Sequence, residues 1–310
     1  MTNQTIAASV PISDSELRAL LLEYRRENWN GIQTEAVQRQ IVNDLMQGDG
    51  ASLLHHVEPY IAISSASRIL DLGSGVGMFV VACRRQGLQA FGLEPDRIGQ
   101  GAKITSIQIA RRRLAEAVFV NGVGEGLPFA DGSFDLVVMN QVIEHVMDQG
   151  AVLGEAVRVL RPGGAVYVAC PNYLRFREPH YRILWAPLLP KVLGRLYLRL
   201  RGRSPAMLDQ LTYTTNRRLR KLLSALGPEF TVVDLHREEF LRKRSAGSFA
   251  ARSTRLVAQL TRLPLIGPLA LRAILAYGAI SEGGCEMLVL RKPMAANKTM
   301  APRDARNETT

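Results

Sequence analysis

The sequence is poor in cysteine, in aromatic residues and in long uncharged hydrophobic runs. Its 310 residues include three cysteines, and 6% of them are aromatic. Cys83, Cys170 and Cys285 are far apart, odd in number and form no CxxC pair. This pattern excludes a disulfide framework and a zinc ribbon, and it fits a reducing compartment. No internal repeat or low-complexity block is visible either.

Patterns typical of membrane-spanning or targeting segments are also missing. A transmembrane helix needs about 18–20 nearly uncharged residues. The most apolar tract, residues 254–280, is interrupted by three arginines and two prolines. The opening stretch MTNQTIAASVPISDSE has neither the basic region nor the apolar region of a signal peptide. We therefore expect a cytoplasmic protein.

The charge of the chain is distributed unevenly. Residues 1–172 carry a formal charge of −4 and residues 173–310 carry +15. A basic half can meet an anionic partner such as a phosphate, a nucleic acid or a membrane surface, or it can be a solvated surface. Arginines are mixed with apolar residues after residue 173, which predicts an anionic acceptor or peripheral contact with the inner face of a membrane. No RNA-binding module is visible, so nucleic acid is not an expected partner.

Short apolar runs alternate with helix-length segments from residue 67 onward. This alternation indicates βαβ units and an α/β fold with a doubly wound, Rossmann-like and mostly parallel sheet. Upstream, Ser13 and Glu16 form a capping-box pattern at the start of a helical region. Strands are expected at 68–72, 89–93, 118–120, 134–139, 165–170, 230–235 and 286–290.

These patterns divide the chain into five expected parts. They are an N-terminal helical lid (1–64), a ligand-binding core (65–172), a basic helical insertion on the acceptor or membrane side (173–229), the last sheet strands with an Arg/Leu-rich insertion (230–294), and a disordered tail (295–310).

The most informative motif is the glycine loop that follows the first strand. In ILDLGSGVGMF, Asp71 precedes the three glycines, and Glu94 closes the next strand, seventeen residues after Gly77. Glycines allow the backbone to approach a ligand closely, and Glu94 is placed to accept hydrogen bonds from a ribose. A nicotinamide fingerprint needs its third glycine where Met78 stands, and Asp71 would repel a pyrophosphate. A ligand with an ammonium group at one end and a ribose at the other fits better.

Four motifs in order carry a family resemblance: ILDLGSGVG, FGLEPD, GEGLPFADGSFDLVVMNQVIEHV and EAVRVLRPGGAVYVACPN. With them the sequence resembles the class I S-adenosylmethionine-dependent methyltransferases. Within that class it is most similar to the methyltransferase type 11 branch, which includes ubiquinone and menaquinone biosynthesis enzymes. The match covers about residues 67–172. It implies a seven-stranded sheet and S-adenosylmethionine as cofactor.

The resemblance also implies roles for individual residues. Val123 stands where the family usually has an aspartate that binds the adenine amine, so main-chain groups and apolar packing are expected to hold the adenine. Glu125 nearby is interpreted as a loop-stabilising residue. The implied cofactor contacts are Asp71 and the loop Gly73, Ser74, Gly75 and Gly77 with the methionine moiety, Glu94 with the ribose, Val123 and Gly124 beside the adenine, and Asn140 through its carbonyl.

Methyl transfer from a sulfonium needs mainly positioning, and a general base helps when the acceptor is a hydroxyl. His145 follows the fourth strand and is the first candidate base, with packing against the cofactor loop as the alternative. Glu178 and His180 follow the fifth strand and are the second candidates, with ordinary packing again as the alternative. No carboxylates and histidines have metal-site spacing, so no metal is expected.

The sequence thus predicts a methyltransferase that acts on a hydroxyl of a small or lipid-linked acceptor, such as a sugar, glycolipid, quinol or secondary metabolite. A carbon or nitrogen methyltransferase with the same cofactor site remains an alternative. A module that binds the cofactor without catalysis is another.

Overall fold

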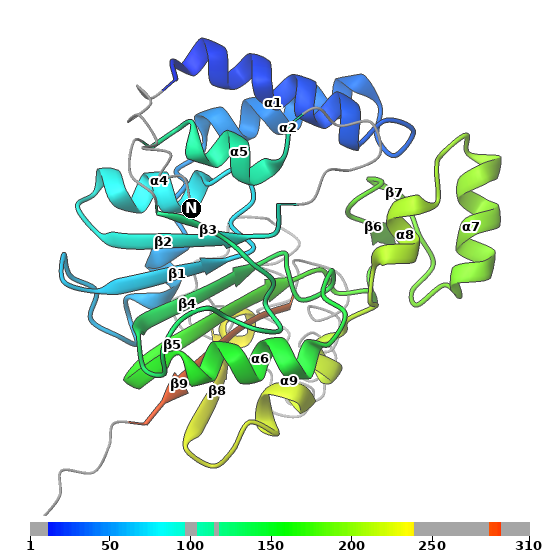
Figure 1. The fold of residues 1–310 in the computed structure, drawn as a ribbon. Coiled ribbons are helices and arrows are strands. Elements are labelled where there is room, and N and C mark those ends of the chain that lie inside the picture. Colours follow the sequence, from blue (N-terminus) through cyan, green and yellow to red (C-terminus); the bar gives the residue numbers. More distant parts are fainter. Residues whose placement is uncertain (1–11, 97–103, 115–117, 239–284, 293–310) are drawn as a thin grey trace, which may run out of the picture.

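The computed structural model describes residues 12–96, 104–114, 118–238 and 285–292 (Figure 1). Its centre is a seven-stranded sheet with the order β3-β2-β1-β4-β5-β9-β8. The first five strands of that order are parallel, β9 runs antiparallel to β5, and β8 runs antiparallel to β9. The predicted α/β, mostly parallel fold is therefore confirmed.

The sheet strands form where the sequence has short apolar runs. Inside the sheet the chain alternates between two faces, so that Ile69 and Val138 pack on one side while Leu70 and Val137 pack on the other. The strands are β1 (Arg68–Leu72), β2 (Gln89–Glu94), β3 (Phe119–Asn121), β4 (Phe134–Asn140), β5 (Leu160–Cys170), β8 (Phe230–Asp234) and β9 (Cys285–Arg291).

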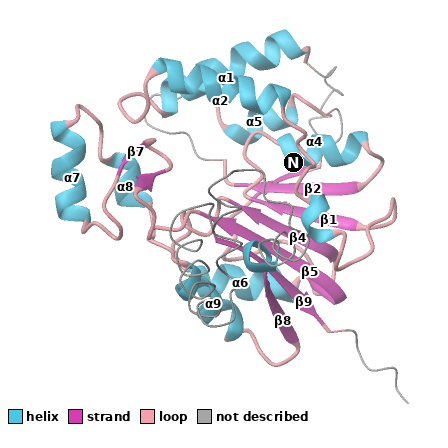
Figure 2. Ribbon diagram, turned by 180° about the vertical axis from the view of Figure 1, so that it is seen from behind, coloured by secondary structure: helices cyan, strands magenta, loops and turns pink. Residues whose placement is uncertain are grey.

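Helices cover both faces of the sheet (Figures 1 and 2). Helices α3 (Leu54–Val57), α4 (Met78–Arg85) and α5 (Ser106–Arg111) pack on one face, and α6 (Gln149–Arg158) and α9 (Asn216–Ser224) pack on the other. Helix α9 lies within the part expected as an insertion, and it joins the main core through two leucines, Leu219 and Leu223.

The N-terminal helices α1 (Asp14–Asn28) and α2 (Glu35–Gln47) lie beside α5 at one end of the sheet (Figure 1). Ser13 forms the predicted capping box with Glu16 at the start of α1. Leu17 and Leu21 of α1 share an apolar cluster with Val42 of α2 and Ile109 of α5. This packing places α1 next to the glycine loop, because Val76 of the loop contacts the same cluster.

The segment after β5 builds a separate small unit away from the sheet (Figures 1 and 2). It consists of a hairpin, β6 (Arg177–Glu178) and β7 (Ile183–Leu184), followed by α7 (Lys191–Leu200) and α8 (Ala206–Gln210). Its own core contains Tyr181, Trp185, Leu198 and Leu208. The sequence did not predict the hairpin, because strands of two residues carry no periodic pattern.

One strand is longer than the sequence predicts, and two expected regions lie largely outside the described residues. Strand β5 begins at Leu160, five residues before its expected start. The Arg/Leu-rich insertion and the tail lie almost entirely outside the described residues. Within the described ranges, no helix is both long and apolar enough to cross a membrane.

Candidate functional site

The glycine loop joins β1 to α4 at the carboxyl end of the parallel strands. Gly77 has a φ of 74°, and a Cβ atom there would lie 2.6 Å from the Phe119 ring. Gly75 has a φ of 52°, and a Cβ atom there would have no heavy atom within 4 Å. The loop is thus held closely on its α5 side at Gly77 and open at Gly75, where a ligand can reach the backbone.

Asp71 is a buried carboxyl at the end of β1. It has no hydrogen-bond or ion-pair partner among the residues that the structure describes. Burial and, secondly, the negative charge of Glu94 raise the pKa of Asp71 to about 8. An acidic group in these surroundings is stabilised by a neighbouring cation, so the site fits the ammonium group of S-adenosylmethionine.

Glu94 lies at the end of β2, beside the loop. One carboxylate oxygen accepts a hydrogen bond from the Gly75 N–H at 3.0 Å, and the other accepts one from the Ser106 hydroxyl at 2.7 Å. These bonds fix the carboxylate between the glycine loop and α5. The carboxylate is positioned at the loop, as a ribose-binding group in this fold would need to be.

The remaining predicted cofactor contacts lie along the same edge. Asn140 ends β4, and Val142 contacts Gly73 so closely that a Cβ on Gly73 would lie 2.5 Å from its side chain. Val123 is 38% exposed, while Gly124 packs against apolar side chains of β1 and α6. Glu125 accepts a hydrogen bond from the Met147 N–H at 3.1 Å, which ties two loops together.

A second group of ionisable side chains comes from the loops after β4 and β5. The nearest ligand atoms of Glu144, His145 and His180 lie within 4.8 Å of one another; we call these three residues the histidine cluster. The Nε2 atom of His145 lies 3.9 Å from a Glu144 carboxylate oxygen. The two imidazole rings meet edge to face, with centroids 5.1 Å apart.

Glu178 contacts the histidine cluster through the ring of His180. Its carboxylate is fully buried and lies 2.8 Å from Nδ1 of His180. It also accepts hydrogen bonds from the Tyr181 N–H at 2.6 Å and from the Tyr173 hydroxyl at 3.3 Å. Glu178 therefore has several partners and fixes the orientation of the His180 ring.

Glu144 has the opposite environment. It is fully buried, and neither of its carboxylate oxygens has a hydrogen-bond partner among the described residues. Burial raises the pKa of Glu144 to about 7. Burial and, secondly, the electrostatic effect of the neighbouring His180 lower the pKa of His145 to about 4, which makes its ring a weaker proton acceptor than a free imidazole.

Helix α1 connects the two groups of residues. Tyr24 lies close enough to Glu94 for that charge, after burial, to raise the pKa of the phenol. The Trp29 ring stacks on His180 with centroids 6.5 Å apart, and the Gln33 side chain donates to the His180 carbonyl at 2.5 Å. Tyr24 and Trp29 are five residues apart, or about 7.5 Å along a helix. The cofactor-type site and the histidine cluster are thus neighbours.

The sequence alone could not place these residues together. The sequence predicts both His145 and His180 at the carboxyl edge of the sheet. They are 35 positions apart, however, and such a separation does not indicate two ligands of one metal site. The contributions of Trp29 and Gln33 were missed, because an amphipathic helix pattern does not show where the helix docks. The signal that could have found the cluster is the pair of Glu/His motifs after two adjacent parallel strands.

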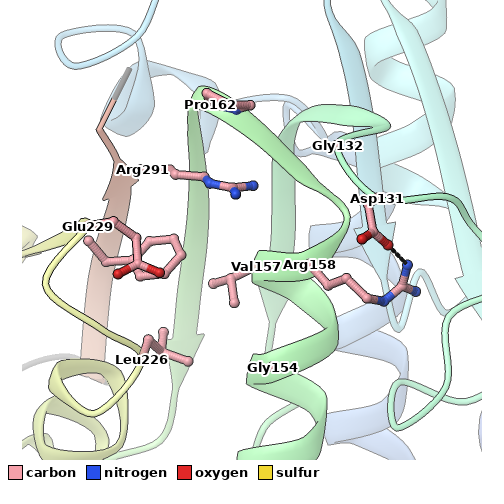
Figure 3. Close-up of a pocket in the computed structure, with 10 residues that line it drawn as sticks. Asp131, Gly132, Gly154, Val157, Arg158, Pro162, Leu226, Glu229 and Arg291 are labelled. Carbon is pink, nitrogen blue, oxygen red and sulfur yellow. Dashed lines mark hydrogen bonds and ion pairs between the residues drawn. The ribbon is translucent and has the colours of Figure 1, made fainter. Parts of the chain in front are cut away.

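A shallow pocket occurs at the other edge of the sheet (Figure 3). Its lining includes Asp131 before β4, Glu229 before β8 and Arg291 at the end of β9. Asp131 and Arg158 form an ion pair of 2.7 Å, drawn as a dashed line in the figure. The pocket contains none of the predicted site residues.

Part of the chain is similar to known methyltransferases. Residues 70–168 match the methyltransferase domain family. The chain is 38% identical over 106 residues to an uncharacterized methyltransferase of Mycobacterium sp. (strain JLS), a match that covers 34% of this chain and 39% of that protein. It is 32% identical over 129 residues to the biotin biosynthesis bifunctional protein BioHC of Cellvibrio japonicus, which covers 41% and 24%. The matched region therefore spans about two fifths, or less, of these relatives.

Among solved structures, the chain is similar to a phosphoethanolamine N-methyltransferase 2 of Haemonchus contortus in complex with phosphomonomethylethanolamine and S-adenosylhomocysteine. The TM-score is 0.50 at 15% identity, covering 91% of this chain and 61% of that one, a likeness of fold alone. Together, the family match, the sheet order and the glycine loop identify residues 70–168 as a class I S-adenosylmethionine-dependent methyltransferase domain.

Proposed function

We propose that the protein transfers a methyl group from S-adenosylmethionine to a hydroxyl group of a small or lipid-linked acceptor. The observation that carries the proposal is the pair of acidic residues at the glycine loop. Asp71 is buried beside Glu94 and has no cationic partner in the described part of the chain. An ammonium group and a ribose on one ligand would complement both carboxylates.

In this proposal the main role of the chain is to position the cofactor and the acceptor. The cofactor, when bound, supplies a methyl group on a sulfonium that is already an excellent leaving group. Asp71 holds the ammonium group, the open backbone at Gly75 faces the methionine moiety, and Glu94 accepts from the ribose hydroxyls. The loop at Val123 and Gly124 borders the adenine through apolar contacts. Fixed in this way, the methyl group is directed at one acceptor atom.

A hydroxyl acceptor must also lose its proton, and the histidine cluster is placed to remove it. The sequence makes His145 the first candidate, but burial lowers the pKa of its ring and makes it a weak base. His180 is the other imidazole of the cluster, and its ring is oriented by Glu178. Because Glu178 engages Nδ1 of His180, the Nε2 atom is left to face a proton donor. The alternatives of carbon or nitrogen methyl transfer, and of cofactor binding without catalysis, would not require this group.

Calorimetric titration with S-adenosylhomocysteine tests the cofactor assignment, and NAD serves as the control ligand. We expect binding of S-adenosylhomocysteine in the micromolar range and no binding of NAD. The bound protein is then incubated with S-adenosylmethionine and with glycolipid or quinol extracts to search for methylated products. Absence of S-adenosylhomocysteine binding, or equal binding of NAD, would contradict the proposal.

We further propose that the protein contacts an anionic membrane peripherally, where a lipid-linked acceptor would be available. Seven of the nine exposed large hydrophobic residues in the described ranges lie between residues 176 and 200. Four of them, Val192, Leu193, Leu196 and Leu200, form one face of α7 and are 54–77% exposed. The basic residues Lys191, Arg195 and Arg199 lie on the adjacent face, as in helices that rest on an anionic bilayer.

The membrane proposal predicts selective loss of vesicle binding in α7 variants. Each exposed leucine stabilises insertion by about 1.5–3 kcal/mol, so the L196D/L200D variant should bind at least about tenfold more weakly. Co-sedimentation with vesicles of phosphatidylglycerol and phosphatidylcholine measures this, and pure phosphatidylcholine tests the charge requirement. R199E should weaken binding, whereas R39E on α2, with the same change in charge, should not. Unchanged binding of the α7 variants would exclude this surface.

A further inference from the structure

Glu144 has a buried carboxylate that the protein itself does not satisfy. Its side chain is 0% exposed, and both oxygens lack a hydrogen-bond partner within the described residues. Buried carboxylates in proteins are nearly always paired, hydrogen-bonded or bound to a metal ion. One of its oxygens lies 3.9 Å from Nε2 of His145, and a ring nitrogen of His180 lies within 4.8 Å of the carboxylate.

The donor atoms around Glu144 are those of a transition-metal site. Two imidazoles and one carboxylate offer three ligand atoms that already lie within 4.8 Å of one another. Ligands bound to one ion at about 2.0–2.2 Å lie about 3.0–3.5 Å apart, so modest side-chain rotation would bring these three into range. The same residue types, two histidines and one carboxylate, are preferred by zinc and by divalent iron, cobalt and nickel rather than by magnesium or calcium.

The surroundings of His180 match what a ligating histidine requires. Such a histidine usually directs its second ring nitrogen at a carboxylate, which fixes the ring and its tautomer. Glu178 provides this carboxylate, 2.8 Å from Nδ1, and leaves Nε2 of His180 as the atom that can bind a metal ion. Glu178 is itself fixed by the Tyr181 N–H, and Trp29 stacks on the other side of the imidazole.

We propose that Glu144, His145 and His180 bind one divalent transition-metal ion, with Glu178 as the outer partner of His180. The His145 side chain retains 34% exposure, so the site borders solvent on that side and has room for further ligands. A role for the ion in catalysis rests on the proposed function. With the ion bound, His180 would act as a ligand in place of its role as a base, and the hydroxyl oxygen of the acceptor would bind the ion and release its proton to water. The methyl carbon would then form its bond to that oxygen as its bond to the sulfonium sulfur breaks, which leaves S-adenosylhomocysteine. Metal binding itself does not depend on that step.

Metal titration of the chelator-treated protein tests the site directly. Calorimetry with Zn²⁺ should show one ion per chain, and Co²⁺ should give visible absorption bands typical of imidazole and carboxylate ligands. We expect E144Q and H180A each to lower the affinity for Zn²⁺ at least about tenfold, in line with the loss of one ligand. H145A, at the most exposed of the three positions, provides a further variant that should fold even if a buried substitution does not.

The matched control is H236A, which removes a surface histidine that also lies beside a carboxylate, Glu286. Its affinity for Zn²⁺ should equal that of the unmodified protein. Equal Zn²⁺ binding in all four variants, loss only in H236A, or no Co²⁺ bands would each overturn the metal site. S-adenosylhomocysteine affinity is measured on the same samples. If S-adenosylhomocysteine binds normally and Zn²⁺ does not bind, only the metal proposal fails. If Zn²⁺ binds and S-adenosylhomocysteine does not, only the cofactor assignment fails.

Discussion

Replacing Glu94 by alanine is expected to weaken S-adenosylhomocysteine binding by at least about 100-fold. A hydrogen bond to a charged group contributes about 1.5–3 kcal/mol, and two ribose hydroxyls would be lost as partners. Glu94 also accepts from the Gly75 N–H and the Ser106 hydroxyl, so the glycine loop loses a constraint in the same variant. Calorimetric titration gives the affinity, and thermal unfolding reports whether the domain remains intact.

Two controls separate these contributions. S106A removes only the hydroxyl partner of Glu94 and should reduce affinity by less than tenfold, as expected for one hydrogen bond. E125A removes another acidic residue of the same edge, which contacts the Met147 N–H, and should leave the affinity nearly unchanged. Retention of full affinity in E94A would remove Glu94 from the cofactor site.

Replacing Asp71 by asparagine should change stability and affinity in opposite directions. The pKa of Asp71 in the folded protein is about 8, above its ordinary value of 3.8. Between these two pH values the folded chain retains a proton that the unfolded chain releases. Stability is therefore lost as the pH rises through this window, by at most about 1.4 kcal/mol per pH unit. Asparagine has no such proton, so D71N should be increasingly more stable than the unmodified protein from pH 5 to pH 8.

The same substitution should weaken cofactor binding, because the ammonium group loses its carboxylate. Binding to the unmodified protein at pH 7 should release a proton from Asp71, and this release should disappear in D71N. Thermal unfolding across the pH range tests the first effect. Titrations in two buffers of different ionisation enthalpy test the second. A D71N protein that is less stable than the unmodified one at every pH would show that burial is not the main influence on the pKa of Asp71.

The sheet and the glycine loop were predictable because local sequence determines them. The apolar runs at 68–72 and 134–139 are long enough to define buried strands, and the loop glycines have few alternatives when φ is positive. The capping box at Ser13 is likewise a local signal. Residues positioned by these elements, such as Asp71 and Glu94, could therefore be placed at one edge from the sequence.

The histidine cluster depends on contacts that are distant in sequence. The two-residue strands of the β6–β7 hairpin decide where Glu178 and His180 point, and such strands leave no periodic signal. The docking of Trp29 on His180 depends on the apolar packing of α1 against α5, which a helical pattern does not specify. That the Glu144 carboxylate lacks hydrogen-bond partners within the described residues can be seen only when the positions of its neighbours are known.

Helix α1 lies beside both groups of site residues. Its Tyr24 lies near Glu94, and Trp29, at the end of the helix, stacks on His180. On the function proposed above, a displacement of α1 that uncovers Glu94 would also move the indole of Trp29 away from His180. Release of S-adenosylhomocysteine and of the methylated product would then share one opening step, and the rate of that step would limit turnover.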